Sequence, residues 1–490
     1  MPENQETRRS FLKGTVATVL AAAASAVAQA QSSVEANRRA GTALPATPPN
    51  IVLYVADQFR ADFVGANGRN GSVHTPNLDA LAACGKNFTH AVTNQPVCGP
   101  ARSVLFTSRH ATDTGVWHNG LGMKRTLPTL AGELRKAGYT ANLIGKWHLA
   151  LENVSDGGDP GPVKAEDRGG FLDLWEGANA LEHTSHPYEG TIWDRDNKPI
   201  TFKDQYRVDF LTDRAERFLR QKQEKPFFLF ISQLEPHQQN DMHQPIAPKG
   251  AAARYANSTV PDDLRALPGT WQAQLPDYYG CIEAIDNSVG RVRRVLEEEH
   301  LADNTIFVFL SDHGCHFMTR NAEYKRSAHN SSIRIPLLVD GPGFRGEQQI
   351  KELVGIIDVA PTLLEAAGVA VPASWQGHSF FPLVNDPEAR AHWPNQQLVQ
   401  ISESMTGRAI RTPDWTYCVA EASGSTKLPA AASYHEYQMY DQRGDPNELV
   451  NLAGRQEYRA KADELREQLK KLLTEAGEPT PEIVPAKLYP

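Results

Sequence analysis

Cys98 opens a short run, Cys98 to Arg102, in which a thiol and a guanidinium lie one helical turn apart with Pro100 between them. Proline favours the first position of a helix, so the run predicts a helix from Pro100 to about Thr107, with Cys98 just before it. The free N–H groups at a helix start favour an anion on residue 98. Arg102 is placed to hold that anion and nearby carboxylates. The alternative is a small buried thiol without a catalytic role.

Four apolar, β-rich runs are each followed closely by polar side chains. The runs are 51–56, 141–144, 227–231 and 305–310, and the polar residues after them are Asp57 with Gln58, Lys146 with His148, Glu235 with His237, and Asp312 with His313. In an open α/β sheet, ligands bind outside the carboxyl ends of the strands, so the four pairs are expected to converge on one crevice. Each pair taken alone is also compatible with ordinary loop residues or helix caps.

Two of these pairs supply hard metal ligands, carboxylate and amide oxygens with one imidazole: Asp57, Gln58, Asp312 and His313. Such a set suits Ca²⁺, with Mg²⁺ or Mn²⁺ as alternatives, rather than a structural zinc. After the second run, Lys146 and His148 can face one anionic ligand, the lysine as a point charge and the histidine as a proton carrier. The alternative is that Lys146 lies on the surface and His148 in the core, with no shared ligand.

The order of the predicted elements indicates an α/β fold. Helical stretches at 127–137, 209–223 and 278–300 alternate with the apolar runs, and a further strand is predicted at 335–339. From Ile282 to Leu296 apolar residues recur every three or four positions, which predicts one face directed at the core. This alternation is typical of a large mixed, mostly parallel sheet covered by helices on both faces.

The N-terminus predicts export. Arg8 and Arg9 precede a short alanine-rich apolar stretch and an Ala28-Gln29-Ala30 cleavage site, so residues 1–30 are predicted to be a twin-arginine signal peptide. The apolar stretch is too short for a stable membrane anchor. Residues 31–49 are predicted to form a flexible leader. The expected location is periplasmic or secreted.

Composition narrows the function classes. The formal net charge of -8 gives no basis for nucleic-acid binding. There are five cysteines, too few and too scattered for a disulfide scaffold: Cys84, Cys98, Cys281, Cys315 and Cys418. If Cys98 is modified, the remaining four can be buried thiols or can pair.

Together, the motifs resemble those of the type I sulfatases of the alkaline-phosphatase superfamily. Residues 96–107 resemble the signature in which a cysteine becomes Cα-formylglycine, and residues 138–148 resemble the second signature. The match runs from about residue 50 to the C-terminus. The resemblance implies a catalytic domain over 50–395 and, over 396–490, a small α+β domain of antiparallel strands and one helix. Strands at 408–419 and 436–440 and a helix at 455–473 suit the second domain.

Carried over by position, the resemblance implies a Ca²⁺ site made of Asp57, Gln58, Asp312, His313 and the formylglycine at position 98. The implied catalytic residues are Cys98, Arg102, Lys146, His148, His237 and Lys325. In the implied mechanism a hydroxyl of the aldehyde hydrate attacks sulfur, assisted by the metal and Asp312, while lysines neutralise the sulfonyl oxygens. His237 then protonates the leaving alcohol, and His148 deprotonates the second hydroxyl so that sulfate leaves and the aldehyde returns.

The chain departs from the family pattern at several positions. Ser108 replaces the usual glycine and Ala141 the usual serine or threonine, at positions that carry no chemistry. Gln58 replaces the commoner second aspartate, which removes one negative charge from the metal site. His313 stands where many members have asparagine, and the proline that usually follows the third histidine, His237, is absent.

The implied substrate is a sulfate ester, either a sulfated carbohydrate or a small aryl sulfate. The implied partners are a formylglycine-generating maturation enzyme and the twin-arginine (Tat) export machinery. A phosphonate monoester or phosphodiester hydrolase of the same superfamily is one alternative, against which Lys146 and His148 favour sulfate. An unmodified, non-catalytic binding protein is the other. Aromatic and imidazole residues in predicted rim loops either contact a sugar or pack under the loops: Trp117, His118, Trp175, His183, His186, Tyr188 and Trp193.

Overall fold

The structure is a computed structural model that describes residues 47–68, 73–152, 161–426 and 428–490. The predicted signal peptide, residues 1–30, lies outside these residues, as does the predicted leader up to residue 46. Within the described part of the chain, no helix combines the length and the apolar character needed to cross a bilayer.

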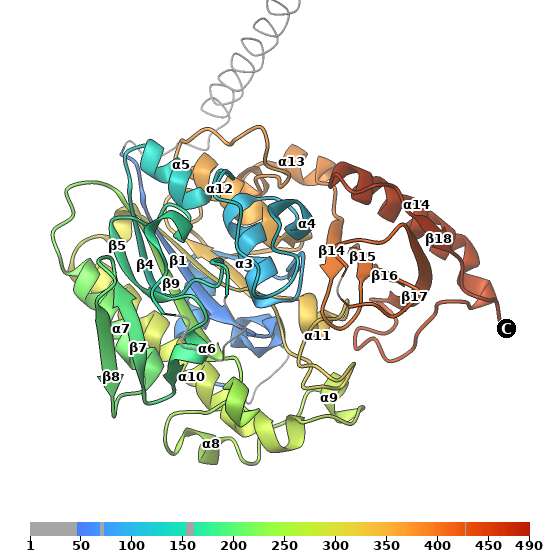
Figure 1. Ribbon diagram of the computed structural model, residues 1–490, viewed down its shortest axis with the longest axis horizontal. Coiled ribbons are helices and arrows are strands. Elements are labelled where there is room, and N and C mark those ends of the chain that lie inside the picture. Colours follow the sequence, from blue (N-terminus) through green and yellow to red (C-terminus); the bar gives the residue numbers. More distant parts are fainter. Residues whose placement is uncertain (1–46, 69–72, 153–160, 427) are drawn as a thin grey trace, which may run out of the picture.

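An eleven-stranded sheet forms the centre of the molecule (Figure 1). Its middle consists of five parallel strands in the order β10 (Thr305–Ser311), β1 (Asn50–Asp57), β9 (Phe227–Pro236), β4 (Thr140–Lys146) and β5 (Leu174–Ala178). β1, β9 and β10 are buried almost throughout because helices cover both faces of the sheet.

Shorter strands extend both edges of this parallel centre. Beyond β10 lie β11 (Leu337–Asp340), β2 (Lys86–Phe88) and β12 (Gln348–Ile350), and beyond β5 lie β7 (Glu189–Asp194), β6 (Ser185–His186) and β8 (Pro199–Lys203). β11 pairs antiparallel with β10, and β7 pairs antiparallel with β5. The predicted mixed, mostly parallel sheet is confirmed, with its antiparallel pairings confined to the edges.

Helices cover the two faces of the sheet (Figure 1). One face packs under α3 (Cys98–Thr107), α5 (Leu130–Lys136) and α12 (Val359–Ala366). The other packs against α2 (Pro76–Cys84), α7 (Arg207–Leu219) and α10 (Trp271–Glu298). Side chains of β1 alternate between the faces: Leu53 belongs to the first core and Tyr54 to the second.

Helix α10 carries the predicted apolar face, since its residues from Ile282 to Leu296 at the expected spacing are buried in the second core. The helix begins at Trp271, seven residues before the predicted start. Pro276 lies inside the helix, and a proline in an apolar pattern normally indicates a boundary. Here buried Leu275 extends the packed face past the proline, so packing outweighs the lost N–H bond.

The C-terminal residues form a separate five-stranded sheet of β14 (Gln397–Ile401), β15 (Gly407–Arg411), β16 (Trp415–Ala420), β17 (Ser433–Asp441) and β18 (Glu482–Val484). Helix α14 (Arg459–Glu475) covers one face, and the other face packs against the central domain around Val92 and Ile333. β18 pairs parallel with β17. That pairing was not expected, because a three-residue strand has no pattern of its own.

None of the five cysteines, all within the described ranges, forms a disulfide. Cys281, Cys315 and Cys418 are buried, and burial raises the pKa of the Cys281 thiol above its usual range. Of the two alternatives left open by the sequence, these three are therefore buried thiols. Cys84 is exposed.

Candidate active site

The carboxyl ends of three central strands meet the start of α3 at one buried centre. Asp57 is the last residue of β1, Lys146 is the last residue of β4, and Asp312 directly follows β10. All three side chains are 0% exposed. The predicted pair of Glu235 and His237 is separated, because β9 continues to Pro236 and leaves Glu235 within the strand. Glu235 forms an ion pair with Arg207 at 2.9 Å, away from the centre.

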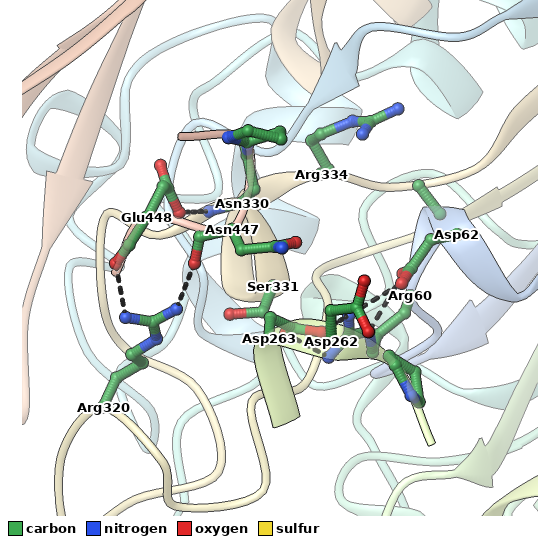
Figure 2. A pocket seen from close by; sticks show the side chains of 13 residues that line it. Arg60, Asp62, Asp262, Asp263, Arg320, Asn330, Ser331, Arg334, Asn447 and Glu448 are labelled. Atoms are coloured by element: carbon green, nitrogen blue, oxygen red, sulfur yellow. Dashed lines mark hydrogen bonds and ion pairs between the residues drawn. The ribbon is translucent and has the colours of Figure 1, made fainter. Parts of the chain in front are cut away.

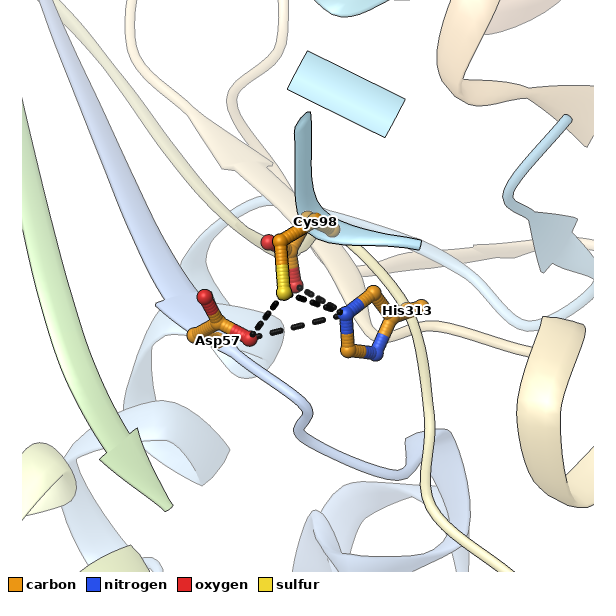
Figure 3. Close-up of side chains that lie close together, drawn as sticks. Asp57, Cys98 and His313 are labelled. Atoms are coloured by element: carbon orange, nitrogen blue, oxygen red, sulfur yellow. Dashed lines mark hydrogen bonds and ion pairs between the residues drawn. The ribbon is translucent and has the colours of Figure 1, made fainter. Parts of the chain in front are cut away.

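Figure 3 shows Cys98 facing Asp57 and His313 in this centre. Cys98 is the first residue of α3 rather than the residue before it, which corrects the predicted start at Pro100. Pro100 occupies the third position, where a backbone N–H has no intrahelical partner to lose. Cys98 Sγ lies 3.5 Å from Asp57 Oδ1 and 3.3 Å from His313 Nε2. Lys325 Nζ donates to the same sulfur at 3.1 Å.

These neighbours favour negative charge on residue 98. Burial raises the pKa of the Cys98 thiol, but Lys146, Lys325 and His313 outweigh it and hold that pKa well below its usual range. The sulfur therefore marks a position where the protein stabilises an anion. If Cys98 is converted to formylglycine, an oxygen of its hydrate takes the place of this sulfur.

Arg102 links the two acidic strand ends. Its guanidinium donates to Asp312 Oδ2 at 3.2 Å and to Asp57 Oδ2 at 3.3 Å. A third bond runs to Ser232 Oγ at 2.7 Å. In the described residues Arg102 thus neutralises carboxylates, and Lys325 rather than Arg102 contacts position 98. Ser232, inside the apolar β9 pattern, gave no signal in the sequence.

The residues present fit a hard metal ion. Candidate ligand atoms of Asp57, Cys98, Asp312 and His313 all lie within 4.8 Å of one another and are buried. Gln58 Nε2 donates to Gln238 Oε1 at 2.7 Å, whereas the buried Gln58 Oε1 accepts no bond from any described residue. A buried amide oxygen without a donor is suited to coordinate a cation. Gln58 has a φ of 67°, which turns it away from the direction of β1.

Lys146 is held between two carboxylates. Its Nζ lies 2.8 Å from Asp57 Oδ2 and 2.7 Å from Glu182 Oε1. Burial lowers the pKa of Lys146, but the two acids and Cys98 raise it above its usual range, so the side chain is an ammonium. Glu182 lies on α6 (Leu181–Thr184), which follows β5. Sequence reasoning missed it because β5 contains Glu176 and Gly177 and lacks a continuous apolar run.

His148 and His237 flank the centre. His148 Nε2 lies 3.1 Å from Glu152 Oε1, a partner not predicted from the sequence. Burial and Lys146 lower the pKa of His148, while Cys98 and Glu152 raise it to about 9. His237 Nδ1 lies 2.6 Å from the carbonyl oxygen of Gln238. Because a carbonyl only accepts, Nδ1 carries the proton and Nε2 is the nitrogen left to exchange one.

The C-terminal sheet reaches the centre through Glu403. Its carboxylate accepts a bond from Asn119 N at 2.7 Å and forms an ion pair with Arg326. Asn119 Oδ1 in turn accepts from Gly99 N at 2.9 Å. Glu403 is therefore linked to the residue after Cys98 on one side and to the residue after Lys325 on the other.

The predicted rim residues divide into two groups. Trp175 lies in β5 and Trp193 in β7, and both are buried in the core, so their predicted placement in loops is wrong and they are packing residues. His186 lies in β6 and His183 in α6, so their predicted placement in loops is also wrong. His186 is half exposed and lies 2.8 Å from Asp241. A pocket of about 480 Å³ borders the centre and is lined by Gln238, Asn240, His243, Thr270, Gln274, Met318, Ala322, Glu323 and Tyr324.

Comparison with known proteins gives consistent matches. The family model "Sulfatase" matches residues 49–369, and the model "N-sulphoglucosamine sulphohydrolase, C-terminal" matches residues 322–475. An ulvan-active sulfatase of Formosa agariphila is 29% identical over 454 residues, which cover 88% of this chain and 82% of the relative.

Two solved structures share the fold. One, in complex with its substrate D-glucosamine-2-N,6-O-disulfate, is 23% identical with a TM-score of 0.70, covering 88% of this chain and 98% of its own. A phosphonate monoester hydrolase of Agrobacterium radiobacter is 22% identical with a TM-score of 0.67, covering 87% and 96%. The fold alone therefore does not separate the two activities. The family model spans more than half of the chain, and the protein belongs to the sulfatase family.

Proposed function

We propose that this sulfatase cleaves sulfate monoesters through a formylglycine made from Cys98, with Ca²⁺ as its metal. The observation that carries the proposal is the position of Cys98 Sγ, which lies at a helix start within 3.5 Å of Asp57 Oδ1, His313 Nε2 and Lys325 Nζ. When bound, Ca²⁺ would supply positive charge near the sulfonyl oxygens, and the hydrated aldehyde would supply two hydroxyls on one carbon. Mg²⁺ and Mn²⁺ suit the same ligands.

The metal would be held by Asp57, Gln58, Asp312, His313 and residue 98. Gln58 supports this assignment because its buried Oε1 has no donor among the described residues. Arg102 keeps Asp57 and Asp312 in place by bonding to both. Arg102, Asp57 and Asp312 are all 0% exposed, so water does not weaken their interactions.

The remaining residues bind the sulfate group and move protons. Lys325 donates to position 98 and Lys146 lies close enough to lower the pKa of its thiol, so both would neutralise the sulfonyl oxygens. His237 would pass the proton on Nε2 to the leaving oxygen. Once residue 98 no longer carries the thiolate charge that raises the pKa of His148, this histidine, oriented by Glu152, would take a proton from a hydroxyl on residue 98, which allows sulfate to depart.

The substrate we propose is a sulfated carbohydrate, with a small aryl sulfate as the alternative. The proposal is supported by the ulvan-active relative and by the related structure with a disulfated glucosamine. The pocket beside Gln238 combines amide, hydroxyl and imidazole groups with apolar surface from Met318 and Ala322, a mixture that suits a sugar ring, and Glu323 adds one carboxylate. For export we propose the twin-arginine route to the periplasm or beyond, after a maturation enzyme has modified Cys98; the support is the sequence of residues 1–30.

The experiment that tests the proposal combines peptide mass with substrate choice. The mass of the peptide spanning Cys98, taken from active exported protein, should be that of the aldehyde; a thiol there would contradict the mechanism. Rates on 4-nitrophenyl sulfate and on a 4-nitrophenyl phosphonate monoester should then favour sulfate. Much faster phosphonate turnover would instead assign the chain the phosphonate hydrolase activity.

A further inference from the structure

Glu182 is a buried carboxylate of the centre to which no role has yet been given. Its side chain is 4% exposed, and Oε1 lies 2.7 Å from Lys146 Nζ. The second oxygen, Oε2, is buried and accepts no hydrogen bond within the described part of the chain. Burial raises the pKa of Glu182, but Lys146, His148 and His237 lower it below its usual range, so the group is an anion.

The backbone around Glu182 is fixed. Leu181 is fully buried in the core, and its carbonyl accepts a bond from Ser185 Oγ at 2.7 Å. The carbonyl of Glu182 accepts from Gln239 Nε2 at 3.0 Å. Gln239 lies two residues after His237, so α6 is tied to the loop that carries the proposed proton donor. The Glu182 carboxylate is therefore held in a fixed position in the centre.

Holding Lys146 in place does not require this second carboxylate. Asp57 Oδ2 already lies 2.8 Å from the same Nζ and is itself fully buried. What Glu182 adds is a negative charge beside the lysine proposed to bind the sulfonyl oxygens. In a buried centre such a charge acts strongly on any anion that binds next to Lys146.

We propose that Glu182 is a selectivity residue that favours esters with one negative charge over esters with two. The inference rests on the proposed function, because it takes Lys146 as a sulfate-binding residue. A sulfate monoester carries one charge, whereas a phosphate monoester carries two above its second pKa of about 6. Glu182 cancels part of the positive charge of Lys146, and the dianion loses more from that cancellation than the monoanion does.

The test compares three esters with the same 4-nitrophenyl leaving group at pH 8: the sulfate and the phenylphosphonate, each with one charge, and the phosphate with two. Glu182→Gln keeps the size and an acceptor for Lys146 while removing the charge. We expect kcat/KM for phosphate relative to sulfate to rise at least about tenfold. The phosphonate to sulfate ratio, matched in charge, should stay within about threefold.

Two controls separate charge from shape. Glu182→Asp retains the charge and should keep both ratios near those of the unaltered protein. Glu176→Gln removes a buried carboxylate from β5, where it pairs with Arg214 at 2.5 Å and Arg217 at 2.7 Å, away from the centre. It should leave both ratios unchanged.

The proposal fails if Glu182→Gln shifts both ratios together or shifts neither. It also fails if the variant keeps its thermal midpoint but loses activity on all three esters, since that would give Glu182 a part in the chemistry itself. Failure of the proposed function is visible separately, because the unaltered, formylglycine-containing protein would then not hydrolyse the sulfate.

Discussion

Two charge clusters, one around Cys98 and one around Arg60, differ in how many of their polar atoms have hydrogen-bond partners. Arg60, three residues after Asp57, donates to both oxygens of Asp62 at 2.9 and 2.7 Å and to both of Asp263 at 3.0 Å. It also donates to the carbonyl of Cys315 at 3.3 Å. Figure 2 shows Arg60 between these acids, beside a pocket of about 290 Å³. Every N–H of this guanidinium has an acceptor.

The centre around Cys98, by comparison, is an open cluster, by which we mean that some of its buried polar atoms lack a hydrogen-bond partner. Gln58 Oε1, Glu182 Oε2 and His148 Nδ1 are buried and have no hydrogen-bond partner in the described residues. Buried polar atoms are normally paired, so a cluster closed on itself serves the fold, whereas a cluster with unmatched acceptors is completed by something it binds. The difference teaches that burial of charge by itself does not identify a functional site.

The largest effect should come from the open centre. Cys98→Ala removes the precursor of the nucleophile, and we expect kcat on 4-nitrophenyl sulfate to fall at least about a thousandfold. The thermal midpoint should change little, because the surrounding bonds among Asp57, Arg102 and Asp312 remain. If the variant keeps substantial activity, the cluster around Cys98 is not the catalytic centre, and unpaired buried polar atoms do not identify the site of the chemistry.

Removing the metal should have the next largest effect. Chelation is expected to lower kcat about a hundredfold or more and to lower the thermal midpoint, because a metal that binds only the folded state stabilises it. Added Ca²⁺ should restore both, and a Mg²⁺ and Mn²⁺ series would rank the ions. Gln58→Leu, which lacks the unmatched oxygen, should need more Ca²⁺ for half-maximal activity; an unchanged requirement would exclude Gln58 as a ligand.

Substitutions in the cluster around Arg60 should lower the stability of the protein rather than its activity. Arg60→Met leaves the buried Asp263 and the partly buried Asp62 without their cation, at a cost of about 3 kcal/mol in the free energy of unfolding. Specific activity of the folded variant should stay within about twofold. Adding Asp62→Asn and Asp263→Asn should recover most of the loss, and urea unfolding followed by fluorescence would measure it.

The same variant has a predicted pH dependence. Burial raises the pKa of Asp62, but Arg60 holds that pKa below its usual value. A depressed carboxyl pKa gives stability that is present above the unfolded value of about 4 and is lost as the pH falls through the folded value. The deficit of Arg60→Met should therefore be largest near neutral pH and shrink in acid. A deficit that grows below pH 4 would contradict the role given to the pair.

The smallest effect is expected where the two parts of the molecule touch. Glu403→Gln keeps an acceptor for Asn119 N but loses the charge that pairs with Arg326. Arg326 retains Glu323 at 2.8 Å, so we expect kcat to fall only about threefold with little change in KM. Glu403→Asp, which keeps the charge, should recover part of the loss. A decrease as large as that of Cys98→Ala would place Glu403 inside the catalytic centre.

Much of this arrangement could be predicted because buried parallel strands have continuous apolar runs. The runs before Asp57, Lys146 and Asp312 are visible in the sequence, and their carboxyl ends share one sheet edge, so the polar residues after them had to meet. Glu182 and Glu152 could not be predicted in the same way. Glu182 follows β5, which has no continuous apolar run, and Glu152 lies in a loop six residues after β4.

Helix starts and short strands were less predictable than strand ends. Proline indicated a start at Pro100, yet the backbone becomes helical at Cys98, since the first three helical residues need no N–H donor. β18, three residues long, pairs with β17 only through the tertiary fold. The β17–β18 pairing joins residues far apart in the sequence, so no local pattern indicates it.

Gln58 and His148 have φ values of 67° and 64°, in the left-handed region that favours glycine. Each conformation costs of order 1 kcal/mol for a residue with a side chain. Glycine at either position would relieve that strain and remove a side chain proposed for metal binding or proton transfer. Selection of variants for thermal resistance in the absence of the metal would thus drive these positions toward glycine and an inert protein. A library screened for heat tolerance should therefore be screened for turnover at the same time.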